Sequence, residues 1–337
     1  MPLKDMLVRF WGVRGSIAAP LRPEQVEDKI VHACCSVARD TSFPKDDPAA
    51  AKRWIQERLT FIERSTFGGN TSCVEVRCDD ALMILDMGTG LRELGISLLP
   101  VALKNKGLQG TILQSHVHWD HIQGYPFWKQ LYMPRRFFDN RFTFFGGREW
   151  DRSLEDVLRG QMNAPVFPVD HRELEDTSMR MEFHAAYDGK EMRVPGPRGE
   201  IHITCRKLHH PQETFGYRIE YRGQVVTFCT DHEPYAGTDV HRSLVDLAKG
   251  ADVFITDCQY SHDEYSGAGG KVQKFGWGHS YPEYIAAVAD RAKPKMVVTT
   301  HHDPESSDER VVELAQAVEN GCGIKTIPAY EGLAIQD

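Results

Sequence analysis

Apolar and polar residues alternate along several stretches of the chain with the period of a β-strand. The first stretch, residues 6–17, runs into a Gly-rich turn, and residues 73–86 fit two strands around the turn Asp79-Asp80. Short apolar runs predict further strands, three of them as a meander; the runs are residues 111–114, 200–206, 215–221, 224–229, 253–256 and 296–299. The chain is therefore predicted to be rich in β-structure.

A period of three to four residues between these runs predicts helices. It occurs at residues 88–105, 241–249, 281–292 and 308–319, and residues 123–132 fit a short helix or turn. Residues 150–196 are polar and poor in regular pattern. Because strands and helices alternate without a clean break, we expect an α/β fold in a single domain over residues 1–337.

The segment at about residues 21–66 is predicted to be a helical insertion. One helix follows Pro23, and a second follows Asp47-Pro48, a good N-cap residue with proline at the first helical position. Both keep apolar residues at helical spacing, Val26, Ile30, Ala33 and Val37 in one and Trp54, Ile55, Leu59 and Ile62 in the other. We expect a packed helical hairpin, and a lid or a dimer surface is the alternative.

The composition is that of a soluble globular protein, with 41% hydrophobic and 26% charged residues in a chain of 337. The sequence shows neither a signal-peptide pattern nor the roughly 20 apolar residues that span a bilayer. Its eight cysteines are scattered, with Cys34 and Cys35 adjacent and no C-x-x-C pair, which is not a disulfide framework. We expect a cytoplasmic protein without a membrane partner.

The formal net charge of -8 argues against a general nucleic-acid-binding surface, since such surfaces need lysine and arginine to replace the counterions of phosphates. It does not exclude a phosphorylated small molecule. Bound metal ions would offset acidic charge locally, because they are often the largest charges in a site.

Candidate chemistry concentrates in residues 115–121, directly after a predicted strand. This stretch has the pattern H-x-H-x-D-H, formed by His116, His118, Asp120 and His121. Imidazole and carboxylate suit zinc and related divalent ions. Alternate residues of an extended loop point the same way, so His116 and His118 can share one ion while Asp120 and His121 face a second.

Three later strands also end in candidate ligands. They are followed by His209-His210-Pro211, by Asp231 after Thr230, and by His301-His302. We choose His210 because it precedes a turn proline, and His301 because it comes first after its strand. His209 and His302 remain alternatives.

Several motifs together resemble the metallo-β-lactamase-fold hydrolases, in the phosphodiesterase branch that includes tRNase Z and class II cyclic-nucleotide phosphodiesterases. The motifs are residues 10–16 (FWGVRGS), residues 69–72 (GNTS) and residues 86–90 (DMGTG), together with the histidine motif. The resemblance covers nearly the whole chain. It implies an αββα sandwich, two sheets packed face to face with helices outside, and a two-metal site at one edge.

The resemblance also implies the ligand assignment. One ion would be bound by His116, His118 and His210, and the other by Asp120, His121 and His301, with Asp231 bridging both. The two divalent ions would be zinc, with manganese or iron as alternatives, and a hydroxide held between them would attack the substrate. Asp86 is expected to hold a ligand imidazole or the metal loop from outside.

The segment Gly278-His279-Ser280 resembles a piece of the tRNase Z-like enzymes. The resemblance places His279 near the leaving-group oxygen as a general acid, with Asp257 as the acidic residue that orients it. Together with Asp120 these two are the predicted catalytic residues. The context of Asp257, followed by Cys258-Gln259-Tyr260, departs from the tRNase Z pattern. The alternative makes Ser280 the N-cap of the next helix, with His279 merely beside it.

The expected substrate is a small phosphodiester such as a cyclic nucleotide. The chain lacks the Gly/Pro-rich arm with which tRNase Z enzymes grip RNA, although residues 134–142 interleave arginines with aromatics, a pattern that suits nucleotides or a β-hairpin edge. Alternatives are a tRNase Z-like endoribonuclease acting on RNA, a lactone or thioester hydrolase, and a metal-bearing nucleotide sensor with little turnover. A homodimer is compatible with this reading.

Overall fold

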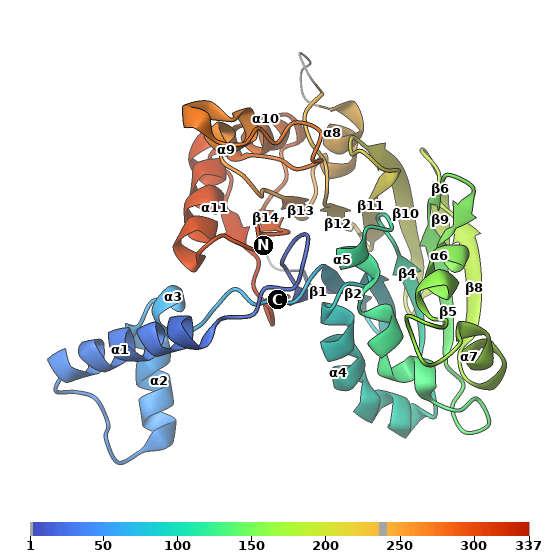
Figure 1. The fold of residues 1–337 in the computed structure, drawn as a ribbon, viewed down its shortest axis with the longest axis horizontal. Coiled ribbons are helices and arrows are strands. Elements are labelled where there is room, and N and C mark those ends of the chain that lie inside the picture. The colour runs from blue at the N-terminus through green and yellow to red at the C-terminus, as the bar shows by residue number, and fades with distance from the viewer. Residues whose placement is uncertain (1–2, 236–240, 337) are drawn as a thin grey trace.

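Two seven-stranded β-sheets lie face to face in the computed structural model, which describes residues 3–235 and 241–336 (Figure 1). The first sheet has the order β16 (Ala334–Ile335), β1 (Met6–Gly12), β2 (Cys73–Cys78), β3 (Ala81–Leu85), β4 (Gln109–Leu113), β5 (Arg141–Gly146) and β8 (Arg180–Ala185). Strands β16 to β3 pair antiparallel, and β3 to β8 pair parallel.

The second sheet repeats this mixture of directions. Its order is β15 (Thr326–Pro328), β14 (Val297–Thr300), β13 (Val253–Asp257), β12 (Gln224–Cys229), β11 (Thr214–Tyr221), β10 (Gly199–Leu208) and β9 (Glu191–Gly196). Strands β15 to β12 are parallel and β12 to β9 antiparallel, so the predicted meander is confirmed.

Three apolar clusters hold the layers together. The largest lies between the sheets and is built from alternate residues of both, among them Phe10, Val76, Tyr217, Phe228 and Ile255. A second joins the first sheet to α4 (Gly90–Asn105) and the short helices η1 (Tyr125–Phe127) and η2 (Lys129–Tyr132). A third joins the second sheet to α8 (Arg242–Ala248), α10 (Pro282–Ala292) and α11 (Asp308–Cys322). The predicted αββα sandwich is confirmed.

The insertion forms an arm that projects from the sandwich (Figure 1). It contains α1 (Pro23–Arg39), α2 (Pro48–Arg58) and α3 (Phe61–Arg64), and the Asp47 carboxylate accepts from two backbone N–H groups at the start of α2. Trp54 and Leu59 are buried, whereas α1 buries none of its residues. The expectation of a packed hairpin is therefore wrong for α1, because the arm carries this helix away from the sheets.

Residues 150–196 are more regular than their sequence pattern indicates. They contain α6 (Leu154–Gln161) and α7 (His171–Thr177), besides β8 and β9, and β7 (Arg152–Ser153), which pairs with β6 (Arg148–Glu149) in a small ribbon. Both helices begin at a side-chain cap: Ser153 with Asp156 in one, and Asp170 in the other. Local capping therefore supplies the order that hydrophobic periodicity does not show.

Residues 134–142 do not form the predicted hairpin edge. They pass through a turn into β5, an interior strand between β4 and β8. Arg135 donates to backbone carbonyls of the segment around α7, and Phe142 is buried. This arginine and this phenylalanine thus support the fold.

The polar loops that carry the candidate ligands gather at one edge of the sandwich. Strands β4, β10, β12, β13 and β14 all end there, and each is followed by one or more of the residues singled out above. Within the described ranges, no helix has the length and apolarity to cross a membrane.

Candidate metal centre

The loop after β4 is held rigidly before it enters α5 (Trp119–Ile122). The Asp86 carboxylate accepts from the backbone N–H and the hydroxyl of Ser115, at 2.8 and 3.0 Å. The Gln114 side-chain amide donates to the carbonyls of His116 and His121, at 2.6 and 3.1 Å. Both ends of the histidine motif are therefore fixed by buried groups.

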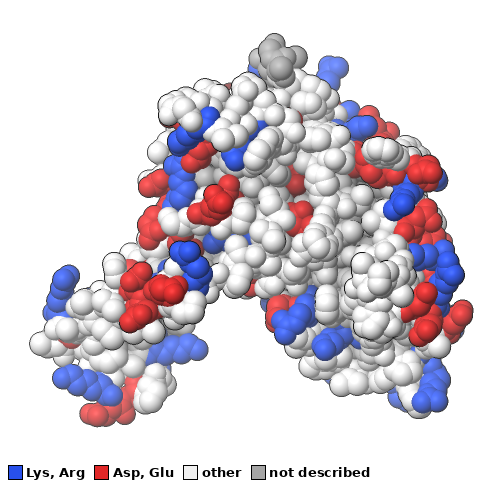
Figure 2. All heavy atoms as spheres, in the orientation of Figure 1, with Lys and Arg blue, Asp and Glu red and all other residues white. Residues whose placement is uncertain are grey.

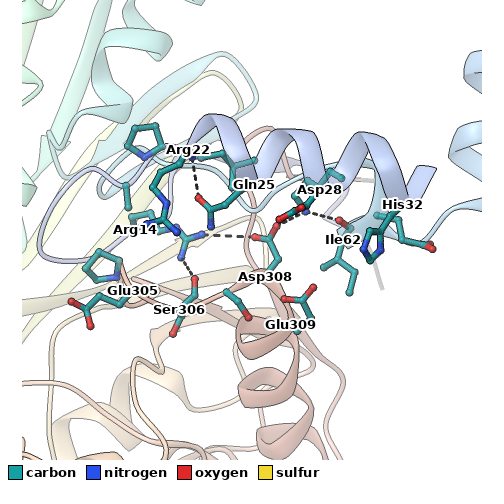
Figure 3. Close-up of a pocket in the computed structure, with 17 residues that line it drawn as sticks. Arg14, Arg22, Gln25, Asp28, His32, Ile62, Glu305, Ser306, Asp308 and Glu309 are labelled. Carbon is teal, nitrogen blue, oxygen red and sulfur yellow. Dashed lines mark hydrogen bonds and ion pairs between the residues drawn. The ribbon is translucent and has the colours of Figure 1, made fainter. Parts of the chain in front are cut away.

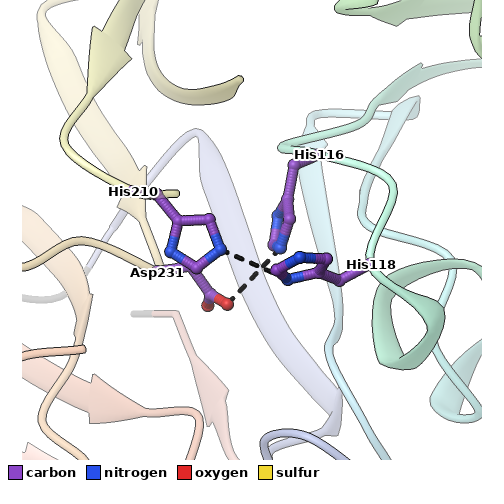
Figure 4. A group of neighbouring side chains, drawn as sticks. All are labelled: His116, His118, His210 and Asp231. Atoms are coloured by element: carbon purple, nitrogen blue, oxygen red, sulfur yellow. Dashed lines mark hydrogen bonds and ion pairs between the residues drawn. The ribbon is translucent and has the colours of Figure 1, made fainter. Parts of the chain in front are cut away.

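The structure brings the predicted ligands together in two groups. One contains His116, His118, His210 and Asp231 (Figure 4), and the other contains Asp120, His121 and His301, with the donor atoms of each group within 4.8 Å of one another. Three strand ends on two sheets contribute to the first group. Residues more than 100 positions apart thus meet at one point.

Asp231 lies between the two groups. Its Oδ2 is 3.5 Å from Nε2 of His116 and 3.3 Å from Nε2 of His121, and its Oδ1 is 3.3 Å from Nε2 of His301. This is the position that a carboxylate bridging two ions would take. Asp231 and His301 also adopt positive φ angles of 60° and 57°, an uncommon conformation for non-glycine residues that often marks functional sites.

Most of the histidines have their outward-facing ring nitrogen bonded to an oxygen. Nδ1 of His121 is 2.7 Å from Oδ2 of Asp86, Nδ1 of His210 is 3.1 Å from the Gly278 carbonyl, and Nδ1 of His301 is 3.3 Å from Oε1 of Gln259. An acceptor at Nδ1 places the proton there and leaves Nε2 as a free electron pair. The Nε2 atoms that carry these electron pairs lie close together: Nε2 of His121 and Nε2 of His301 are 3.1 Å apart.

The glycine at position 278 permits the close approach to His210. Its φ is 84°, and a Cβ there would lie 1.8 Å from Nδ1 of His210. Only glycine accommodates both the conformation and the contact. The Gly-rich segment before His279 therefore has a packing role at the site.

Burial and charge set the protonation of the site. Burial lowers the pKa of His116, and it lowers the pKa of His210 to about 4, so both rings are neutral at pH 7. Burial alone would raise the pKa of Asp231, yet the neighbouring His301 and His121 hold it well below its usual range. The pKa of His121 is raised because Asp120, Asp231 and Asp86 outweigh its burial. Divalent cations could replace the protons that balance these carboxylates.

The residues present fit divalent metal ions. Nε2 of His116 is buried and has no hydrogen-bond partner in the part of the chain that the structure describes. Such an orphaned acceptor costs free energy unless a ligand fills it. Neutral imidazoles and ionised carboxylates are the donor set that zinc and related ions take.

The two double histidines are separated by the direction of their side chains. His210 and His301 point into the site, whereas His209 stacks on Tyr235 and Nε2 of His302 is 2.8 Å from the Ala329 carbonyl. The geometry thus favours the two histidines that were chosen from the sequence.

Metal content should distinguish His210 from its neighbour His209 as the ligand. The variant His210→Ala is expected to bind about one equivalent of zinc less than the wild type, because it removes a donor of the first group. His209→Ala, the matched control, should retain the full content, measured by inductively coupled plasma mass spectrometry after dialysis. Equal loss in both variants would contradict the assignment of His210.

His279 lies beside the metal groups with Asp257 behind it. Its ring is stacked 5.0 Å from the ring of His301, and its Nδ1 is 3.6 Å from Oδ2 of Asp257. That carboxylate also accepts from the Ser280 backbone N–H at 2.8 Å. Ser280 does not cap α10, whose N-cap is Tyr281, so the alternative role for Ser280 is wrong.

Two contributors were missed in the sequence. His232 is buried, with Nε2 3.2 Å from Oδ1 of Asp257 and Nδ1 3.0 Å from the Ser280 hydroxyl. The backbone N–H of Ser16 donates to Oδ2 of Asp120 at 2.7 Å. The first follows directly after Asp231 and could have been suspected, whereas the second uses a main-chain group that no side-chain pattern reveals.

A pocket of about 370 Å³ opens over the two groups. Its walls include Tyr260, Gln212 and the half-exposed Trp277. The ammonium of Lys274 lies 3.8 Å from the centre of the Trp277 ring and 5.4 Å from that of Tyr260. A larger cavity of about 870 Å³ lies at the base of the arm (Figure 3) but contains none of the predicted ligands. The smaller pocket is the one that predicted ligands line.

The sequence model of the family described as Beta-lactamase superfamily domain matches residues 83–302, which include all the predicted ligands. Ribonuclease BN of Proteus mirabilis is 24% identical over 249 residues, covering 60% of this chain and 74% of that protein. Uncharacterized protein Mb1374 of Mycobacterium bovis is 26% identical over 214 residues, covering 62% of this chain and 68% of the relative.

Solved structures share the fold at low sequence identity. A diphosphatase from the PhnP family has a TM-score of 0.59 at 16% identity, and human tRNase Z, short form, has 0.56 at 15%, each covering 98% of both chains. Unliganded yeast PDE1 has a TM-score of 0.59 at 12% identity and covers both chains completely. At these identities the likeness concerns the fold.

Proposed function

The chain belongs to the β-lactamase superfamily, and on that premise we propose that it is a two-metal phosphodiesterase acting on a small phosphodiester such as a cyclic nucleotide. The coarser statement, a metal-dependent hydrolase, is supported by the family and by the two donor groups. The finer statement depends on one observation: His279, backed by Asp257, lies beside those groups.

The protein's own residues would hold the reacting groups in place. His116, His118 and His210 would hold one divalent ion and Asp120, His121 and His301 the other, with Asp231 shared by both. When bound, such a pair of ions supplies a water nucleophile at neutral pH and withdraws charge from a phosphoryl oxygen. Asp86 and Gln259 orient the imidazoles from outside.

His279 is assigned the proton transfer to the leaving group. A phosphodiester expels an alkoxide, and an imidazolium within reach of that oxygen lowers the barrier. Asp257, 3.6 Å from Nδ1 of His279, would keep the ring oriented. Lactone and thioester hydrolysis rank lower because the Gly278-His279-Ser280 segment resembles the phosphodiesterase branch.

Names among the relatives agree with chemistry on phosphate esters. They include a ribonuclease, a tRNase and a diphosphatase. The ribonuclease relatives make an endoribonuclease the second candidate. Two observations argue against an endoribonuclease. The net charge of -8 disfavours binding of a long polyanion, and the pocket volume of about 370 Å³ is near the lower limit for small-molecule sites.

Trp277 is expected to contact an aromatic base of the substrate. The variant Trp277→Ala should raise KM for a cyclic nucleotide about tenfold, with little change in kcat, because base stacking stabilises the bound substrate. Phe275→Ala is the matched control: Phe275 is similarly exposed, at 53% against 49%, but does not line the pocket. An equal KM in wild type and Trp277→Ala would show that the base lies elsewhere.

The proposal is tested by comparing bond types with protein of measured metal content. Protein with two equivalents of zinc or manganese is expected to hydrolyse bis(p-nitrophenyl) phosphate and leave a lactone intact. Cyclic nucleotides and a 3′-extended tRNA then separate the two candidates. Fully loaded protein that opens the lactone and spares every diester would overturn the proposal.

A further inference from the structure

Tyr260 brings a phenol hydroxyl to the pocket over the metal groups. The residue is 4% exposed and lines this pocket together with Asp120, Asp231 and His301. Its ring packs edge-on against that of His279, with 5.9 Å between the ring centres. The hydroxyl has no hydrogen bond to any residue that the structure describes. Because buried polar groups are almost always hydrogen-bonded, we expect this donor to meet a ligand.

Backbone contacts hold Tyr260 at the pocket. The N–H groups of Gln259 and Tyr260 both donate to the Ser280 carbonyl, at 3.1 and 3.2 Å. The Gln259 side chain lies 3.3 Å from Nδ1 of His301. Tyr260 is thus tied to the segment that carries His279 and to the residue that orients a predicted ligand.

A lysine lies over the same part of the pocket wall. The ammonium of Lys274 is 3.8 Å from the ring centre of Trp277 and 5.4 Å from that of Tyr260, and both rings line the pocket. Within the described ranges, this ammonium has neither an ion pair nor a hydrogen bond. Lys271 on the same loop, by contrast, lies 3.5 Å from a carboxylate oxygen of Glu264. Lys274 therefore supplies an unpaired positive charge.

The turn that carries Lys274 is anchored to a buried carboxylate. The Trp277 N–H donates to the Lys274 carbonyl at 3.1 Å. One oxygen of Glu233 accepts from the Gly276 N–H at 2.9 Å and from the Tyr265 hydroxyl at 3.2 Å. Gly276 has a φ of 79°, which glycine adopts without strain. The turn thus keeps Lys274 and Trp277 side by side.

Positive side chains are otherwise scarce at the pocket. As far as the described residues show, its lining contains no lysine or arginine, whereas it contains the carboxylates of Asp120 and Asp231. Lysines and arginines lie mostly around the margin of the visible face, whose central part is largely uncharged (Figure 2). In a chain of net charge -8, a lysine without a carboxylate partner at this place is suited to attract an anion.

We propose that the Tyr260 hydroxyl and the Lys274 ammonium form an anion subsite, which binds a non-bridging oxygen of the substrate phosphodiester. This inference rests on the proposed function. A phosphodiester carries its negative charge on two non-bridging oxygens, and preorganised donors in a pocket stabilise such charge. The phenol supplies a directed hydrogen bond, and the ammonium supplies a point charge with three donors. Tyr260 is then a further catalytic residue, and Lys274 contributes to substrate binding.

Removal of the hydroxyl alone tests the role of Tyr260. Tyr260→Phe should lower kcat/KM for bis(p-nitrophenyl) phosphate about 30-fold at unchanged metal content, because a hydrogen bond to a charged oxygen is lost. Tyr281→Phe is the matched control. The Tyr281 hydroxyl also lacks a hydrogen bond within the described residues, but Tyr281 does not line the pocket, so this variant should match wild type.

Salt dependence tests the role of Lys274. Lys274→Met should raise KM for the same diester about tenfold at low salt, and the difference from wild type should shrink at high salt, since mobile ions screen the charge. Lys271→Met is the matched control, because Lys271 is an exposed lysine of the same loop that is paired with Glu264. A purely structural role for Lys274 predicts a loss that is independent of salt.

Binding of inorganic phosphate separates the anion subsite from the proposed function. Isothermal titration calorimetry on metal-loaded protein should show weaker phosphate binding by Tyr260→Phe and by Lys274→Met than by wild type. If wild type cleaves the diester and either variant equals it in kcat/KM and in phosphate affinity, the anion subsite is overturned and the proposed function stands. If wild type cleaves no diester and both variants bind phosphate more weakly, the anion subsite stands and the proposed function is overturned.

Discussion

Replacing Asp120 with alanine is expected to abolish hydrolysis of phosphodiesters. Its Oδ2 lies 3.1 Å from Nε2 of His301 and 3.3 Å from Nε2 of His121, so the substitution removes the only carboxylate of the second group apart from the shared Asp231, as far as the described residues show. Loss of an outer partner of a metal ligand typically costs 10- to 100-fold in activity. Loss of a ligand itself should exceed about 100-fold.

Metal content and activity should fall together in this variant. We expect about one equivalent of metal to be lost, and excess zinc or manganese should not restore activity, although it restores chelator-treated wild type. Asp139→Ala is the matched control, because Asp139 is a partly exposed aspartate paired with Arg141 and lines neither group of ligands. An Asp120→Ala variant with undiminished kcat/KM would exclude the proposed second metal position.

His279→Ala is expected to produce the second largest loss, and its size should depend on the leaving group. On a cyclic nucleotide, which expels an alkoxide, kcat should fall about 100- to 10,000-fold, the usual contribution of general acid catalysis. On bis(p-nitrophenyl) phosphate, whose leaving group is already a stable anion, the loss should be small.

A structural or metal-binding role for His279 gives different results. His279 also lies in a third group of possible ligands with Asp231 and His301, so metal analysis is needed beside the kinetics. Unchanged metal content with a loss that depends on the leaving group supports the acid. Lower metal content with equal loss on both substrates supports a ligand. Asp257→Asn should show the intermediate effect of a positioning residue, and the exposed His262→Ala should show none.

The sequence predicted the fold because each layer leaves a local trace. An alternating pattern marks β2 and an apolar run marks β3, and both strands are buried along nearly their whole length. A helical period marks α4, α10 and α11, because each helix buries one face. The structure of residues 150–196 and the surroundings of α1 were not predicted from the sequence. Capping side chains order the former without hydrophobic periodicity, and the periodic residues of α1 remain exposed. A helical period therefore predicts a helix but not what covers it.

The sequence by itself determined the donor types, their positions after strands, and the chain order that brings parallel strand ends to one edge. Only the tertiary structure decided which member of each histidine pair faces the site, because neighbouring residues of an extended loop point to opposite sides and packing selects one. It also decided the contacts of Ser16 and His232 with Asp120 and Asp257. Such contacts join segments more than 20 residues apart, and no local pattern encodes a distance between atoms on separate elements.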